Sequence, residues 1–199
     1  AKVLQTRSVE LAMKMGVRVQ VRSTFEESTG TLVVDEDEIM EQQLVSGIAY
    51  SRDEGKISLL GVSDRPGVAA SIFGPLADAS VNVDMIVQST SSDGKSTDIT
   101  FTVGKTDMER AMEILNRVQP DLGIRAIQTD ENVVKVSVIG VGMRSHAGVA
   151  QAMFQTLAEK GINVQVISTS EIKISVLIAE EYTELALRAL HTAYGLDTD

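Results

Sequence analysis

The stretch SDRPGVAASIF, residues 63–73, carries the most suggestive chemistry of the sequence: a carboxylate, a Pro-Gly pair and then an apolar periodic run. The run predicts a helix, whose N-terminus offers N–H groups and a partial positive charge to an anion. A phosphate-binding loop would need further glycines, or a lysine followed by a hydroxyl, and only Gly67 is present. Two interpretations remain open. The residues by themselves favour an ordinary turn, and the other is a site for an amino acid whose ammonium group pairs with Asp64.

Other polar residues suited to binding lie at the ends of predicted elements. Asn82 and Asn163 each separate a predicted helix from a strand, where turn chemistry by itself accounts for asparagine. Gln88 ends a predicted strand and faces either solvent or a ligand. In the tight turn STSE, residues 168–171, turn propensity again suffices. Alternatively, Ser170 and Glu171 accept hydrogen bonds from a cationic ligand, because a half-buried ammonium needs a paired carboxylate.

The composition excludes several classes of site. The chain has 199 residues, of which 43% are apolar, and its formal charge of −10 argues against binding to a nucleic-acid backbone. It has no cysteine and only two histidines, which excludes disulfides, thiolate metal sites and a His-rich metal site. No apolar run approaches membrane-spanning length and no signal peptide is visible, so we expect a soluble cytoplasmic protein that does not bind membranes.

The chain contains an internal repeat. PGVAASIFGPLADASVNVDMI, residues 66–86, aligns with AGVAQAMFQTLAEKGINVQVI, residues 147–167, at a constant offset of 81 residues. Such a repeat indicates a duplicated supersecondary unit. The matching positions include Gly67 with Gly148, Val68 with Val149, Ala69 with Ala150, Phe73 with Phe154, Leu76 with Leu157, Asn82 with Asn163, Val83 with Val164 and Ile86 with Ile167.

Each unit begins strand, helix, strand, strand, helix. In the first unit the predicted strands are 57–62, 83–88, 98–103 and 123–128, and the helices are 67–79 and one opened by the capping box TDME from Thr106 to Glu109. This order is the ferredoxin-like βαββαβ pattern. The second unit lacks its last strand, and the unassigned segment 44–50 supplies it, because an open sheet edge would leave backbone groups unpaired.

The predicted fold class is therefore α+β: tandem ferredoxin-like βαββαβ domains with antiparallel sheets, the first inserted in the second. Residues 1–35 fit neither repeat and read as a helix ending at Gly16 as C-cap, then two short strands, like the tail of another domain. The predicted divisions are 1–35, a linker and strand at 36–52, and repeats at 53–130 and 131–199. Because AKVLQTRSVE lacks an initiator Met, we expect an excised fragment or a trimmed product.

The segments TRSVELAMKMGVRVQVRSTF, GVSDRPGVAA, TDITFTV and NVQVISTSEIKISVLI together resemble the C-terminal regulatory part of aspartate kinases. The resemblance implies that residues 1–35 are the C-terminal tail of an amino-acid kinase domain and that 53–130 and 131–199 are ACT domains. It implies feedback regulation by threonine, lysine or both. It also implies a catalytic kinase domain or subunit that uses ATP and Mg²⁺ on aspartate. No phosphate-binding or metal-binding motif appears here, so we expect no catalytic residues, metal site or cofactor in this chain.

The resemblance also implies an effector site. It therefore favours the amino-acid site over the ordinary turn as the interpretation of the loop around Asp64. The expected ligand lies between the first repeat of one chain and the second repeat of another, within a homodimer formed through the ACT domains. The implied effector residues are Asp64, Gly67, Val68, Ala69 and Gln88 from the first repeat and Asn163 and Val164 from the second, with Ser170 and Glu171 for a cationic effector such as lysine. Two alternatives are a free-standing amino-acid sensor for a different partner and a purely structural dimerisation module.

Overall fold

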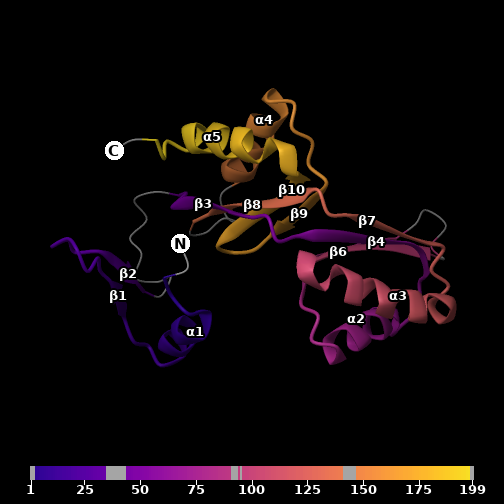
Figure 1. Cartoon of the computed structure of the whole chain (residues 1–199). Coiled ribbons are helices and arrows are strands. Elements are labelled where there is room, and N and C mark those ends of the chain that lie inside the picture. Colours follow the sequence, from indigo (N-terminus) through magenta and orange to yellow (C-terminus); the bar gives the residue numbers. More distant parts are fainter. Residues whose placement is uncertain (1–2, 35–43, 91–93, 95, 141–146, 198–199) are drawn as a thin grey trace. The chain divides into compact units, whose positions relative to one another are not determined.

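The computed structural model describes residues 3–34, 44–90, 94, 96–140 and 147–197 (Figure 1). The chain divides into two compact units, Ala1–Leu44 and Val45–Asp199. Within the described ranges, no helix is long and apolar enough to span a membrane. Residues 36–43 of the predicted linker and strand at 36–52 lie outside the described residues, and the predicted domain divisions stay predictions.

The first unit contains one helix and one small sheet. Helix α1 spans Thr6–Lys14, and strands β1 (Val19–Val21) and β2 (Thr31–Val33) form an antiparallel pair. The predicted helix and both strands are present, but the C-cap is Met15, and Gly16 follows it in the left-handed conformation. None of the residues of α1 is buried in this unit.

The second unit holds both repeats, and the first repeat forms a four-stranded antiparallel sheet in the order β5-β6-β4-β7. Helices α2 and α3 pack on one face of this sheet around fully buried Ile57, Ile72 and Phe101 (Figure 1). The elements are β4 (Gly55–Ser63), α2 (Val68–Asp78), β5 (Val83–Thr90), β6 (Ser96–Val103), α3 (Met108–Leu122) and β7 (Ala126–Asp130).

Two predictions about the first repeat are wrong in detail. The Thr106 capping box does not form: Lys105–Asp107 is a 3-10 turn, and α3 begins at Met108 without a side-chain cap. Asp53 accepts a hydrogen bond from the Lys105 N–H at 2.8 Å, so a distant carboxylate satisfies a donor at this helix start. The last strand begins at Ala126 rather than at residue 123, because Gly123 is the left-handed C-cap of α3.

The second repeat forms a sheet in the order β3-β8-β10-β9, which matches β7-β4-β6-β5 of the first repeat. Strand β3 precedes the first repeat in sequence and pairs with β8, with Gly47 opposite Ile139 and Ser51 opposite Lys135. The predicted fourth strand is therefore confirmed, and the first repeat is inserted in the second. The elements are β3 (Gly47–Ser51), β8 (Val133–Ile139), α4 (Ala147–Glu159), β9 (Val166–Thr169), β10 (Lys173–Ala179), the 3-10 turn Glu180–Tyr182 and α5 (Thr183–Ala193).

Candidate functional site

A surface hollow of about 430 Å³ lies where the first repeat turns from β4 into α2. Strands β4 and β5 are both antiparallel to β6, so their C-terminal ends lie at the same edge of the sheet. This arrangement brings Gln88 of β5 beside the loop that follows β4. The hollow is lined by Asp64, Arg65, Pro66, Gly67, Val68, Ala69 and Gln88.

The N-terminus of α2 opens on this hollow. Gly67 is the N-cap with a left-handed φ of 88°, and no side chain caps the helix. A Cβ at Gly67 would meet no atom within 4 Å, so the backbone angle, and not crowding, favours glycine here. The Val68 N–H donates to the Arg65 carbonyl at 3.2 Å. The N–H groups of Ala69 and Ala70, which follow in the first turn, and the helix dipole together favour a carboxylate ligand.

The two charged residues of the loop have different roles. The Arg65 guanidinium donates a hydrogen bond to the carbonyl of Asp121 at 3.2 Å and so ties the loop to the end of α3. Asp64 is exposed on the loop and supplies a carboxylate within the lining of the hollow. An α-amino acid carries a carboxylate and an ammonium group a few ångströms apart, and the helix N-terminus and Asp64 complement these charges.

The other predicted site residues do not line this hollow. Asn163 is exposed in the loop after α4, and Val164 packs against the core of the second repeat. Ser170 closes the turn after β9: its N–H donates to the Lys173 carbonyl at 2.8 Å, and its hydroxyl accepts the Lys173 N–H at 3.2 Å. Glu171 is exposed in the same turn. The structure thus groups the five first-repeat residues, and a ligand role for all nine stays a prediction.

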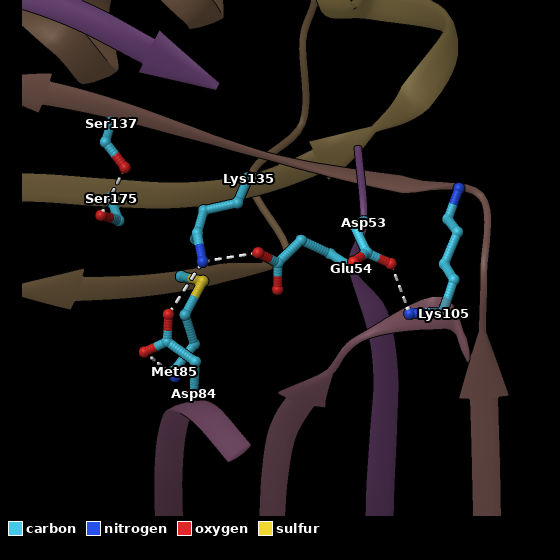
Figure 2. Close-up of polar contacts among 8 residues, drawn as sticks. All are labelled: Asp53, Glu54, Asp84, Met85, Lys105, Lys135, Ser137 and Ser175. Carbon is cyan, nitrogen blue, oxygen red and sulfur yellow. Dashed lines mark hydrogen bonds and ion pairs between the residues drawn. The ribbon is translucent and has the colours of Figure 1, made fainter. Parts of the chain in front are cut away.

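A second polar cluster, which the sequence did not indicate, lies where the two repeats meet. The Lys135 ammonium of β8 contacts Glu54 Oε1 at 2.5 Å and Asp84 Oδ2 at 2.8 Å, and both carboxylates belong to the first repeat (Figure 2). The Lys135 side chain is 17% exposed and that of Glu54 is 6% exposed. A lone charge in the apolar run VVKVSVI was the available signal, because a charge in a buried strand needs a partner.

These contacts shift the pKa of two groups in the cluster. Burial by itself would lower the pKa of Lys135, but hydrogen bonds to Asp84 and Glu54 outweigh burial and raise it above 10.5. Burial by itself would raise the pKa of Asp84, but hydrogen bonds from Lys135 and from the Met85 N–H outweigh it and lower the pKa below 3.8. Both groups are therefore held in their charged forms at neutral pH.

Among the residues that the structure describes, no group of three or more His, Asp or Glu side chains is arranged to hold a metal ion. The residues of the second repeat that correspond to Asp64 and Arg65 fall in the range 141–146, outside the described residues. The geometry of a matching hollow in the second repeat is therefore not described.

The sequence and the fold match known proteins over the whole chain. The ACT domain model matches residues 57–119 and 136–194. Aspartate kinase Ask_LysC of Stutzerimonas stutzeri strain A1501 is 54% identical over 99% of this chain and 48% of its own length. The chain thus spans about half the length of the curated relatives that it matches first.

Two crystal structures match about three quarters of the chain. A chain in the structure of aspartokinase alpha and beta subunits is 51% identical, with a TM-score of 0.71, over 76% of this chain and 99% of that one. The ligand-free regulatory subunit of aspartate kinase from Thermus thermophilus is 39% identical, with a TM-score of 0.73 and the same coverage. The expected resemblance to regulatory parts of aspartate kinases is confirmed.

Proposed function

Because the chain belongs to the ACT-domain family and is similar to aspartate kinase regulatory subunits, we propose that it binds a free amino acid and passes the signal to a kinase. The proposed effector is threonine, lysine or both, and the proposed kinase is the catalytic domain or subunit of a cytoplasmic aspartate kinase. That partner would phosphorylate aspartate with ATP and Mg²⁺, on the path to lysine, threonine and methionine. The chain described here supplies the regulatory part.

The observation that carries this proposal is the hollow at the start of α2. It combines an uncapped helix N-terminus, the carboxylate of Asp64 and the amide of Gln88 within one surface. Threonine fits this chemistry because its carboxylate faces the helix, its ammonium faces Asp64, and its hydroxyl can bond to Gln88. Pro66 and Ala69 also line the hollow and offer apolar contacts that suit a small side chain.

The site is proposed to be completed by a second copy of the chain. Strand β5 lies at the edge of the first sheet and β9 at the edge of the second, and each exposes an apolar residue, Ile86 at 51% and Ile167 at 45%. Pairing of sheet edges between two copies would cover these residues and place Asn163 and Val164 of one copy near the hollow of the other. A ligand that bridges two copies favours one quaternary arrangement over others.

Calorimetry with threonine tests the proposal, with Asp64→Ala as the decisive variant. Loss of a charge-assisted hydrogen bond should cost about 1.5–3 kcal/mol, which is roughly tenfold or more in affinity, while the fold stays intact. The control is Asp78→Ala, an exposed carboxylate at the opposite end of α2. Equal affinity of wild type and Asp64→Ala, or no threonine binding even with lysine present, would contradict the assignment.

A lysine site is a second part of the proposal, with Ser170 and Glu171 as the acceptors. Thermal melting with each of the twenty amino acids, singly and as threonine plus lysine, separates an amino-acid sensor from a purely structural module. A feedback sensor is stabilised by its effector, because a ligand that binds the folded state raises its melting temperature. A purely structural dimerisation module would show no such shift with any amino acid.

A further inference from the structure

Among the ion pairs that join the two repeats within the described residues, the pair between Lys135 and Glu54 is the most buried. Lys135 of the second repeat contacts Glu54 and Asp84 of the first, and its side chain and that of Glu54 are both largely withdrawn from solvent (Figure 2). A further inter-repeat ion pair, Lys105 with Glu180 at 3.1 Å, is about one third exposed on both sides. Directional contacts strengthen as water is excluded, so Lys135 is the better placed of the two to set the geometry of the junction.

Met85 adds an apolar contact beside this lysine. Its side chain is 3% exposed and packs with Val133, Val166 and Leu177 of the second repeat. Its backbone has a φ of 48°, which is unfavourable for a residue with a long side chain, and its N–H donates to Asp84 Oδ1 at 2.7 Å. The strand is bulged at this point, since the register of β5 against β6 shifts between Asp84 and Val87.

Both carboxylates that hold Lys135 stand at the starts of strands that lead to the hollow. Glu54 immediately precedes β4, which ends at the loop containing Asp64, and Asp84 is the second residue of β5, which carries Gln88. Strand β4 is also irregular, with a register shift between Leu59 and Val62. The junction between the repeats and the hollow therefore lie at opposite ends of the same two strands, β4 and β5.

We propose that four residues, Lys135, Glu54, Asp84 and Met85, form a clamp that holds the two repeats in one relative orientation. In this clamp Lys135 pairs with Glu54 and Asp84, and Met85 packs beside them. The ion pairs are directional, and an arrangement of the repeats that separated Lys135 from Glu54 would leave a buried charge without its partner, which is strongly unfavourable. Since β4 and β5 run from the clamp to the hollow, the clamp is the point at which an occupied hollow would act on the second repeat. This last step rests on the proposed function.

Spin-label distance measurements on the ligand-free full chain test the clamp. The sequence has no cysteine, so Glu113→Cys on α3 and Ala158→Cys on α4, both exposed, label one repeat each. Labelled chains are mixed with excess unlabelled chain so that only distances within one chain contribute. Lys135→Met should replace a single narrow distance distribution by a broader or shifted one. The matched control Lys160→Met, an exposed lysine just after α4, should leave it unchanged.

A second variant covers the case in which Lys135→Met leaves buried Glu54 unpaired and disrupts folding. The double variant Glu54→Met, Lys135→Met replaces both buried charges by apolar groups of similar length, a change that often preserves stability. We expect the double variant to melt cooperatively, but to show a broader or shifted distribution of distances between the two spin labels. A folded double variant with the distance distribution of wild type would overturn the clamp.

Threonine addition to the labelled wild type tests the coupling step. A change in the inter-repeat distance on binding, absent in the double variant, supports it, and binding seen by calorimetry without any change overturns it. If calorimetry shows no threonine binding even with lysine present, the threonine site and the coupling step both fail. The ligand-free comparison of wild type and variants still decides the clamp by itself.

Discussion

Ser80 and Gly161 occupy the same position of the two repeats, one residue before the loop that follows the first helix. Both have a left-handed backbone, with φ of 58° and 68°. In each repeat the next N–H bonds back to a helix carbonyl at 2.9 Å, from Val81 to Leu76 and from Ile162 to Leu157. The backbone geometry is thus conserved between the repeats, while glycine, the residue that favours it, is present only in the second.

Ser80→Gly should therefore stabilise the chain. A residue with a Cβ in the left-handed region destabilises the folded state by roughly 1–2 kcal/mol. Glycine removes this strain, but its greater conformational freedom also stabilises the unfolded state, so we expect a net gain in stability of about 0.5–1 kcal/mol. Urea unfolding would report a higher midpoint with an unchanged slope. Gly161→Ser is the reciprocal variant and should lower the midpoint. A lower midpoint for Ser80→Gly would refute this account of the helix end.

At the level of elements, strand β3 belongs to the sheet of the second repeat, although the whole first repeat separates it in sequence from the other strands of that sheet. The first repeat separates it from β8, yet β3 lies against β8 over Gly47–Ser51, and the preceding Val45 is buried in the core of the second repeat. Its hydrogen bonds should therefore open when the second repeat opens, because amides within one cooperative unit exchange together.

Hydrogen exchange in two matched variants tests this assignment. Ile174 of β10 and Ile99 of β6 hold equivalent positions, and each is 1% exposed in its own core. Each Ile→Ala change should cost about 2–5 kcal/mol in its repeat. Ile174→Ala should speed exchange in β3, whereas Ile99→Ala should speed exchange in β4 and β6 first. Faster β3 exchange in Ile99→Ala than in Ile174→Ala would show that β3 opens with the first repeat, contrary to the prediction.

At the level of the whole molecule, stability should form a plateau across neutral pH. The folded-state pKa of Asp84 lies below 3.8, so its contribution is present above that pH and is lost as pH falls through the lowered value. The folded-state pKa of Lys135 lies above 10.5, so its contribution is present below that pH and is lost as pH rises through the raised value. Burial raises the pKa of Tyr194 to about 12, which removes further stability between pH 10 and about 12.

Urea unfolding at a series of pH values should show a plateau between about pH 5 and 9 and a fall on both sides. Tyr194→Phe should flatten part of the alkaline fall. At neutral pH it should cost about 0.5–1.5 kcal/mol, since the Tyr194 hydroxyl donates to the Val149 carbonyl at 2.7 Å. If wild type and Tyr194→Phe lose the same unfolding free energy at alkaline pH, ionisation of Tyr194 does not contribute to that loss.

Patterns in the amino-acid sequence predicted the repeated unit, the order of strands and helices, and the need for a strand from outside the second repeat. These features follow from periodicity and from the pairing that every strand edge requires, which are local or additive properties of the chain. The grouping of Asp64, Gly67 and Gln88 was also predictable, because two strands of the same direction end at one edge of their sheet. The ligand for that grouping stays a prediction.

The contacts between the two repeats, in contrast, are seen in the folded chain and were not predicted from the sequence. Asp53 takes the place expected of the Thr106 cap, and Glu54 and Asp84 converge on Lys135 from positions far apart in the chain. No periodic pattern marks such pairs, because their distance depends on how two finished sheets dock and not on the spacing of residues within either one. The physical reason is that a side-chain contact between elements is set by their relative position, which local sequence preferences do not encode.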